Sequence, residues 1–392
     1  MGQFSLGYNL LFWDKNEMKL AYLGDAQSNH TLRWVQYFAE AGHSVSLLSF
    51  QKMQVVHPKI NFIQLTLPAR LQGIRYLSTV RKVIRNSLTK IKPDIVHAHY
   101  ISGYGHFAWL SGFRPYVLTA WGSDLFLDKK RSSTSQLLTR LALTSAALVT
   151  ADSNDLIRTA KKLGAKPSHI YNIQFGVDTE LFRPQLSTAD LRQRLKIPEH
   201  KKIILSPRGL QPGYNIDQIV RAFALLYAHT QNIHLLIKDF NSPPKFREEI
   251  DLLVKELNIT GGVSFLNAVA FSELPALHNL ADVEVSIPTS DGTPVTVLEA
   301  MACGALIVAC DVPSLREWIT DGENGWLVDP TNLQQIAQAI SNALELAPSI
   351  RNKIQQKNVE IVMQRGNHQT NMRQVENLYQ KIHNSPRDLA NE

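Results

Sequence analysis

The chain alternates short strand-like runs with segments of helical periodicity over most of its length. The runs are rich in β-branched and apolar residues, and apolar residues recur at helical spacing between several of them. In the first half these runs lie at 19–24, 44–50, 60–66, 94–100, 116–122, 147–152 and 169–176. In the second half they lie at 202–209, 233–239, 262–267, 283–290, 305–311 and 325–330. Such alternation predicts the α/β class, with largely parallel sheets covered by helices on both faces.

The length of 392 residues indicates about two domains. A polar segment separates the two alternating series, and we expect two doubly wound, Rossmann-like domains that face each other across a cleft. Ligands of such sheets bind beyond the carboxyl ends of the strands. The expected organisation is an N-terminal extension (1–17), an acceptor-side domain (18–180), a linker (181–201), a donor domain (202–368), and a C-terminal helix and tail (369–392) that can dock back on the first domain.

The formal charge is +7, from 41 basic and 34 acidic residues. Basic clusters at 81–85, 129–131 and 161–166 fit a solvated face or attraction to an anionic membrane surface. They lack interleaved aromatic residues, which argues against a nucleic-acid partner. The N-terminal sequence lacks the pattern of a signal peptide, and no run of about 18 apolar residues occurs. We therefore expect a cytoplasmic protein, at most peripheral at the inner membrane face.

Glu299 is the only charged residue between Val295 and Cys310. An ionised carboxylate in apolar surroundings costs several kcal/mol unless something pairs with it. Just upstream, Gly292 permits close backbone approach, Thr293 is suited to capping a helix and Pro294 to its first turn. The combination predicts an anion site at a helix start, with an acceptor for ligand hydroxyl groups behind it.

Two cysteines, Cys303 and Cys310, lie seven residues apart in apolar sequence. This is neither a zinc spacing nor a disulfide framework, so buried free thiols are expected. His97 and His99 lie on one face of a strand, but no third ligand lies nearby, so we expect no metal site. We expect one of these histidines to contact substrate, or else to be a satisfied strand-end side chain.

Three segments resemble family-4 retaining glycosyltransferases of the GT-B type: residues 290–330, 174–184 and 93–100. The resemblance covers roughly residues 18 to 385. It implies transfer of a sugar from a nucleotide-diphosphate donor with retention of anomeric configuration and without a metal or other cofactor. The absence of a DxD motif agrees with metal independence.

The resemblance also implies roles for two acids eight residues apart, Asp291 and Glu299. Glu299 would accept hydrogen bonds from the ribose hydroxyls, and Asp291 would contact the transferred sugar. Main-chain amides from Gly292 to Val295, across Thr293 and Pro294, would meet the sugar and the distal phosphate. The alternatives are a structural ion pair for Glu299 and an Asx turn for Asp291.

Three positions depart from the family pattern. Asp291 stands where glutamate is usual. The loop SPRGLQPGYN keeps Arg208 but has Tyr214 where a lysine is expected. Lys238, at the end of the next strand, is either a replacement cation or an ordinary strand-end lysine.

The third departure is Trp121, which replaces a histidine that normally contacts the donor sugar. The role of that histidine is either lost or taken by Asp124 or His99. With Asp291 and Arg208, these two residues complete the set of candidate catalytic residues.

In the first domain, Gly24, Asn29 and His30 lie where a loop between strand and helix could approach a phosphate or the acceptor. Turn and helix-cap chemistry is the alternative. Gly103, Gly105 and Ala108 spell GxGxxA, with Asp124 about 20 residues on, a spacing typical of dinucleotide sites.

We therefore expect a glycosyltransferase that uses a UDP-, GDP- or ADP-sugar. Its acceptor would be a carbohydrate or lipid-linked molecule of glycan, polysaccharide or glycolipid biosynthesis. One alternative is a catalytically impaired subunit that binds nucleotide sugars, suggested by Tyr214 and Trp121. Another is a nicotinamide-dependent dehydrogenase, suggested by the glycine pattern.

Overall fold

A computed structural model describes residues 17–53, 57–69, 72–240, 242–267, 269–289 and 291–384. The expected N-terminal extension lies outside this part of the chain apart from Glu17, as does the end of the expected C-terminal tail. The chain divides into two compact units. The first unit comprises Met1–Thr119, Ser133–Val149 and Tyr379–Glu392, and the second comprises Ala120–Ser132 and Thr150–Leu378. Neither unit is one continuous stretch.

The first sheet has, among the described residues, seven strands in the order β3-β2-β1-β4-β5-β6-β7. Pairing is parallel between β1 and β2, β1 and β4, β2 and β3, and β4 and β5. The strands are β1 (Lys19–Leu23), β2 (Ser44–Ser49), β3 (Ile60–Gln64), β4 (Ile95–His99), β5 (Tyr116–Thr119), β6 (Leu148–Ala151) and β7 (Ile170–Asn172).

The helices of this half lie between its strands in the chain. In α1 (Asn29–Glu40), Trp34, Val35, Phe38 and Ala39 are buried on one face. The others are α2 (Gly73–Ile91), α3 (His106–Ser111), α4 (Ser123–Phe126), α5 (Ser133–Ser145) and α6 (Asn154–Leu163).

The second sheet has six strands within the described residues, in the order β10-β9-β8-β11-β12-β13, and every neighbouring pair is parallel. The strands are β8 (Lys202–Ser206), β9 (Ile233–Lys238), β10 (Val263–Leu266), β11 (Val283–Ser286), β12 (Leu306–Cys310) and β13 (Trp326–Val328). Because the chain steps outward from β8 in one direction and then returns to add β11 on its other side, the order reverses between β8 and β11. This reversal is where doubly wound sheets bind ligands.

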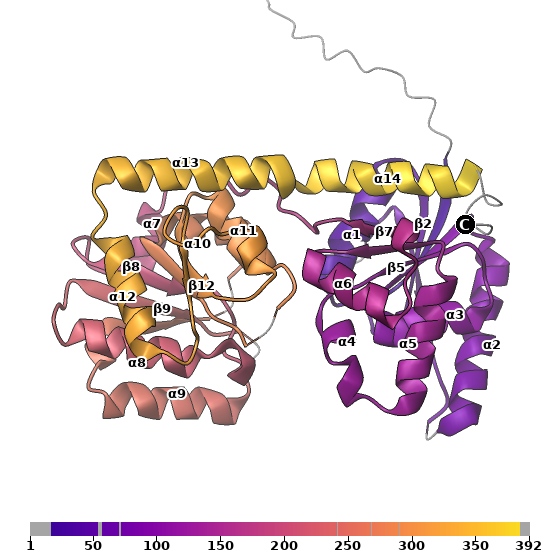
Figure 1. Cartoon of the computed structure of the whole chain (residues 1–392), viewed down its shortest axis with the longest axis horizontal. Coiled ribbons are helices and arrows are strands. Elements are labelled where there is room, and N and C mark those ends of the chain that lie inside the picture. Colours follow the sequence, from indigo (N-terminus) through magenta and orange to yellow (C-terminus); the bar gives the residue numbers. More distant parts are fainter. Residues whose placement is uncertain are drawn as a thin grey trace, which may run out of the picture. The chain divides into compact units, whose positions relative to one another are not determined.

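The faces of the second sheet are buried in separate cores. Ile204 of β8 packs into one core with Val220 and Phe223, whereas its neighbours Ile203 and Leu205 pack into another core. This alternation is the two-residue period of a strand covered on both faces. The covering helices, several of them labelled in Figure 1, are α7 (Ala189–Arg194), α8 (Ile216–Tyr227), α9 (Pro244–Glu256), α10 (Leu274–Leu280), α11 (Val295–Ala302), α12 (Leu333–Leu344) and α13 (Pro348–Arg365). Helix α14 (His368–Asn384) follows α13 in the chain and is divided between the two units.

The expected α/β class with two parallel sheets is thus confirmed. In the described part of the chain, no helix combines the length and apolar character needed to cross a membrane.

Candidate functional site

The loop after β8 brings Arg208 to the point where the strand order reverses. Its guanidinium Nη2 lies 2.9 Å from Oδ2 of Asp291, which follows β11. Its Nη1 donates to the Thr296 hydroxyl at 3.5 Å, a long contact, and its Cζ lies 4.1 Å from the centre of the Tyr214 ring. Tyr214, which stands where the family pattern has lysine, therefore supports Arg208 through a cation–π contact.

The backbone of this loop is held in place at three points. Gly209 allows close approach, because a Cβ there would lie 2.7 Å from the Phe240 carbonyl oxygen. Asn215 adopts a left-handed conformation (φ 54°), and its side-chain amide donates to the Ile287 carbonyl at 2.8 Å. The Thr289 amide donates to the Gly213 carbonyl at 3.0 Å. These contacts join the loop after β8 to the ends of β9 and β11.

Lys238 ends β9, next to this loop, and is half-buried. Burial lowers the pKa of its ammonium group, and the charge of Glu299 opposes that shift. Arg208 is near enough to lower the pKa further. The structure thus gathers both candidate phosphate-binding cations and Glu299 in one region of the second unit.

The segment before α11 differs from expectation in one respect. Helix α11 begins at Val295 with Pro294 as its N-cap residue, so Thr293 does not cap it. The Thr293 hydroxyl instead accepts a hydrogen bond from the Trp318 indole at 3.4 Å. Proline at the cap leaves Thr293 one residue too far from the first turn to satisfy its amides.

Asp291 lies just before this segment. The Ser314 hydroxyl donates to its backbone carbonyl at 3.0 Å and holds the main chain there. Burial raises the pKa of the Asp291 carboxyl, and the Arg208 guanidinium lowers it by a smaller amount. The Asp291 carboxyl is therefore buried beside the Arg208 guanidinium, its partner in an ion pair.

Glu299 is buried in α11, with only 5% of its surface exposed. The expectation that this acid has a partner is met from within the protein, because Nε2 of His278 lies 3.8 Å from its Oε2. Nδ1 of the same imidazole contacts Oε1 of Glu284 at 2.7 Å. The sequence analysis missed both His278 and Glu284. Glu284 carried the same signal as Glu299, since it is the one charged residue in the apolar run VEVSIPT.

Four candidate residues lie in the first unit. A Cβ on Gly24 would lie 2.9 Å from the Thr31 side chain, so this glycine allows the start of α1 to pack closely. Asn29 and His30 are the first residues of α1. His99 is buried at the end of β4, where burial, and then the charge of His30, lower its pKa to about 3. His99 is therefore neutral at physiological pH.

Asp124 lies in the first turn of α4, is fully buried and accepts a hydrogen bond from the Trp121 amide at 3.0 Å. Both residues belong to the second unit. Within the described ranges, no group of three or more His, Cys, Asp or Glu side chains is arranged to hold a metal ion. Cys303 and Cys310 are buried free thiols.

Two family models match this chain. The model described as "Glycosyl transferases group 1" matches residues 187–360, and "Glycosyl transferase 4-like" matches residues 19–153. The chain belongs to the family-4 glycosyltransferases. The resemblance seen in the sequence is thereby confirmed, and nothing remains to favour a dehydrogenase.

This family-4 glycosyltransferase is similar to curated proteins over part of their length. It is 29% identical over 275 residues to D-inositol 3-phosphate glycosyltransferase from Mycobacterium bovis, a match that covers 67% of this chain and 56% of that protein. The protein of the same name from Corynebacterium glutamicum is 24% identical over 280 residues, which are 65% of each chain. The match thus spans less than two thirds of these relatives.

Solved structures show that the chain has the GT-B fold. Sucrose-phosphate synthase from Thermosynechococcus elongatus superimposes with a TM-score of 0.80 at 20% identity, covering 93% of this chain and 99% of that one. The Anabaena protein Alr3699/HepE in complex with UDP-glucose has a TM-score of 0.78 at 18% identity, covering 93% and 100%. The expected pair of Rossmann-like domains is therefore confirmed.

Proposed function

We propose that this protein transfers a sugar from a nucleotide-diphosphate sugar to an acceptor hydroxyl, with retention of anomeric configuration and without a metal ion. The observation that carries the proposal is the arrangement of Arg208, Asp291, Lys238 and Glu299 beside the point where the strand order of the second sheet reverses. Two cations suit a pyrophosphate, and two carboxylates suit the hydroxyl groups of ribose and sugar.

In this proposal the leaving group is stabilised by charge. As the bond between the sugar and the phosphate breaks, negative charge develops on the distal phosphate. Arg208 would exchange Asp291 for that phosphate, and Lys238 would assist it. Main-chain N–H groups between Gly292 and Val295 would donate to the same oxygen atoms, except at Pro294, which has none, and at Thr293, whose amide donates to the Asp152 carboxylate at 3.2 Å.

The two carboxylates have separate roles. Glu299 would accept from the ribose hydroxyls, and Asp291, once released by Arg208, would accept from hydroxyls of the transferred sugar. The leaving phosphate itself would take the acceptor proton, so that the sugar is delivered to the face from which the phosphate departs. In this proposal the contact that the replaced histidine would make with the donor sugar is either lost or made by Asp124 or His99.

A UDP-sugar is the first donor to test, because the Anabaena neighbour was solved with UDP and with UDP-glucose. The acceptor in this proposal is a carbohydrate or a lipid-linked molecule, and the exposed Arg81, Lys82 and Arg85 of α2 would suit an anionic surface.

The test begins with thermal unfolding of the full chain in the presence of UDP-, GDP- and ADP-sugars. A donor at 100 times its dissociation constant should stabilise the folded state by about 2.7 kcal/mol. Mixing that donor with candidate acceptors in EDTA should release nucleoside diphosphate, and proton NMR of the product should show the anomeric configuration of the donor. Failure of all three donors to bind folded protein contradicts the proposal, and an inverted product contradicts retention.

The alternative is a subunit that binds a donor without turnover. It would show donor stabilisation in the thermal test and no nucleotide release with any acceptor. The contact between Arg208 and Tyr214 supports compensation for the absent lysine rather than loss of activity.

A further inference from the structure

Three buried charged side chains stand in a row in the second unit. They are Glu284 on β11, His278 on α10 and Glu299 on α11, with exposed fractions of 1%, 2% and 5%. The imidazole lies between the two carboxylates, 2.7 Å from Oε1 of Glu284 and 3.8 Å from Oε2 of Glu299. Buried charges persist in proteins when they are paired, so the row is held together by the charge of its middle member.

The geometry gives the two carboxylates different roles. Glu284 is within hydrogen-bond distance of Nδ1, and this contact fixes the orientation of the ring and directs Nε2 toward Glu299. At 3.8 Å the second contact is an ion pair and too long for a hydrogen bond. Glu299 therefore keeps oxygen lone pairs for other donors while its charge is compensated.

Side chains from several elements surround His278. Phe182 places its ring centre 5.9 Å from the imidazole, and Cys303 lies near both carboxylates. Lys238 of β9 acts on Glu284 and Glu299 through its charge. The remaining side borders a cavity of about 570 Å³.

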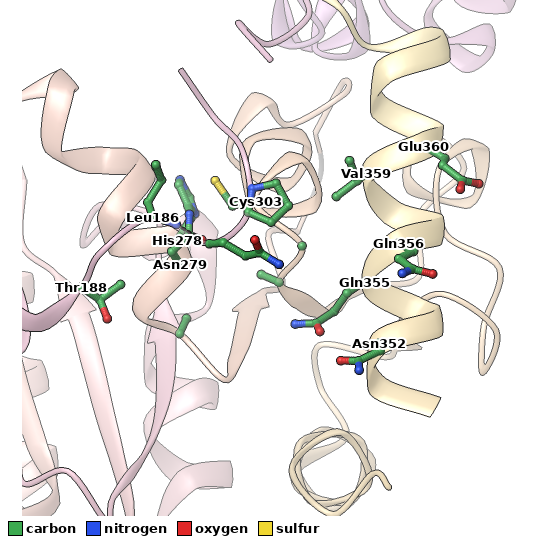
Figure 2. A pocket seen from close by; sticks show the side chains of 15 residues that line it. Leu186, Thr188, His278, Asn279, Cys303, Asn352, Gln355, Gln356, Val359 and Glu360 are labelled. Atoms are coloured by element: carbon green, nitrogen blue, oxygen red, sulfur yellow. Dashed lines mark hydrogen bonds between the residues drawn. The ribbon is translucent and has the colours of Figure 1, made fainter. Parts of the chain in front are cut away.

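Figure 2 shows this cavity with His278 and Cys303 on one side and Asn352, Gln355 and Gln356 of α13 on the other. A small molecule therefore has a route to the position of the ring.

We propose that His278, oriented by Glu284, is a positioning residue that holds the Glu299 carboxylate in place for the ribose hydroxyls of the nucleotide donor. This inference rests on the proposed function, because it takes Glu299 to be the ribose acceptor. It adds a residue pair that acts on the ligand only through Glu299.

The protonation of His278 gives the proposal a consequence. Burial alone lowers the pKa of this imidazole, but Glu284 and Glu299 outweigh it and raise the pKa to about 9. Below that pH the ring is an imidazolium with a proton on Nε2. Above it, Nδ1 keeps its proton for Glu284 and Nε2 presents a lone pair to Glu299, which repels the carboxylate. Nucleotide affinity should therefore fall as the pH rises through about 9.

The test measures binding of UDP and of 2′,3′-dideoxy-UDP by calorimetry, or of the GDP or ADP pair if wild-type protein prefers that base. The proteins are wild type, His278→Gln, Glu299→Gln and the double variant. We expect each single variant to weaken UDP binding roughly tenfold and the double variant to be no weaker than Glu299→Gln, because both changes remove one function. Binding of the dideoxy nucleotide should be the same for all four proteins.

Three pH profiles of UDP affinity separate positioning from a structural role. Wild-type affinity for UDP should fall near pH 9. Titration of Lys238 contributes equally to the profiles of wild type and His278→Gln, and the His278→Gln profile should lack the part of the fall that comes from His278. Glu284→Gln keeps an acceptor for Nδ1 but removes a charge. Its affinity for UDP should equal that of wild type at pH 7, and as the pH rises the affinity should begin to fall at a lower pH than in wild type. Identical profiles for wild type and His278→Gln would overturn the proposal.

The outcomes for the two proposals are distinct. If Glu299→Gln weakens UDP binding and folded His278→Gln stays within twofold of wild type, the positioning role is wrong and the proposed function stands. If Glu299→Gln has no effect, or wild type binds none of the three nucleotides, the ribose assignment fails and the positioning role fails with it.

A variant that lacks the imidazole ring, His278→Ala, distinguishes loss of folding from loss of positioning. His278→Ala opens onto the cavity, and imidazole added in solution should restore UDP affinity without changing dideoxy-UDP affinity. The same imidazole should do nothing for Glu299→Gln. If His278→Gln lacks a cooperative thermal transition, His278→Gln/Glu284→Gln, which leaves neither charge of that pair, replaces it in every comparison. A folded variant with lost affinity that imidazole does not restore counts against the proposal.

Discussion

Arg208 makes contacts that explain two of the departures from the family pattern. It is paired with Asp291 at 2.9 Å, and its guanidinium lies over the ring of Tyr214. A lysine at position 214 would place a like charge beside Arg208, whereas tyrosine offers it a flat, apolar support. The shorter side chain of Asp291 still reaches the guanidinium. The residues at these two positions are thus matched to each other through Arg208.

Replacing Arg208 by alanine should lower kcat more than it weakens donor binding. In the proposed reaction, the negative charge that develops on the distal phosphate is complete only when the phosphate leaves, and the Arg208 guanidinium stabilises that charge. Loss of one such group costs roughly 10²–10³-fold in kcat. Steady-state kinetics and calorimetry with the preferred donor measure the two effects. Arg221→Ala, an exposed arginine on α8, is the matched control and should behave as wild type. Equal losses in kcat and affinity would mean that Arg208 binds ground state and transition state alike.

Changing Tyr214 to lysine should not raise turnover. The new ammonium would repel the Arg208 guanidinium and remove the ring beneath it, so we expect kcat at or below the wild-type value. Release of nucleoside diphosphate under saturating donor measures it. An increase of tenfold or more would instead show that the wild-type protein is an impaired subunit that lysine repairs.

At the scale of elements, helix α14 crosses from one compact unit to the other. Its residues up to Leu378 belong to the second unit, and those from Tyr379 belong to the first. The Tyr379 hydroxyl contacts Nδ1 of His97 on β4 and lies 3.1 Å from the Tyr22 hydroxyl on β1. The other imidazole nitrogen of His97 lies 2.6 Å from the Thr119 hydroxyl. Tyr379 of α14 is therefore joined to the first sheet by a buried polar network.

Tyr379→Phe should lower the free energy of unfolding of the first unit by about 1–3 kcal/mol. Removal of the hydroxyl leaves buried polar atoms of His97 and Tyr22 without this partner. Tyr379→Ala, which also leaves a cavity, should cost more, about 3–5 kcal/mol. Urea unfolding followed by circular dichroism measures both. The exposed Lys381→Ala on the same helix is the control, and a Tyr379→Phe value as small as that of the control would show that the hydroxyl network contributes nothing.

At the scale of the whole molecule, buried histidines have pKa values shifted in opposite directions. Burial lowers the pKa of His97 and His99 in the first unit, to about 3 for His99. In the second unit the pKa of His278 is raised to about 9, because two carboxylates outweigh its burial. The pKa of His234, also in the second unit, is lowered to about 4, mainly by burial, so His278 is the exception among these buried histidines.

The contribution of His278 to stability should therefore be lost at the opposite end of the pH scale from the contributions of His97, His99 and His234. In the unfolded state, histidines bind protons near pH 6.5. In the folded first unit, His97 and His99 do not, so their contribution to stability is full above that pH and falls as the pH is lowered. The contribution of His278 is full below pH 6.5 and is lost as the pH rises to about 9. Hydrogen exchange of peptides from each unit at pH 5, 7.5 and 9, corrected for intrinsic rates, measures this.

The control for this prediction is His278→Gln, which should remove the alkaline loss from the second unit alone. Lys238 has a lowered pKa and titrates in the opposite sense, so the difference between wild type and variant is the quantity to compare. Equal loss of protection at pH 9 in the second unit of wild type and of His278→Gln would contradict the assignment.

Much of the fold could be predicted because strand and helix periods are local properties of the sequence. The runs that ended at the Arg208 loop, at Lys238 and before Asp291 are strands β8, β9 and β11 of one sheet. The capping role given to Thr293 was wrong, because the exact start of a helix depends on contacts such as the one between Thr293 and Trp318. His278 was missed because a histidine at helical spacing looks like any partly polar core residue.

The sequence alone determined the class of fold and the need of Glu299 for a partner, since a single charge in an apolar run costs free energy wherever that run is buried. Only the tertiary structure decided which groups pair with the Glu299 carboxylate. His278 and Glu284 come from a neighbouring helix and strand, and Tyr379 meets a histidine 282 positions earlier in the chain. Such pairings depend on how the strands are ordered in the sheets, and strand order arises from burial of whole elements, which no local pattern of residues contains.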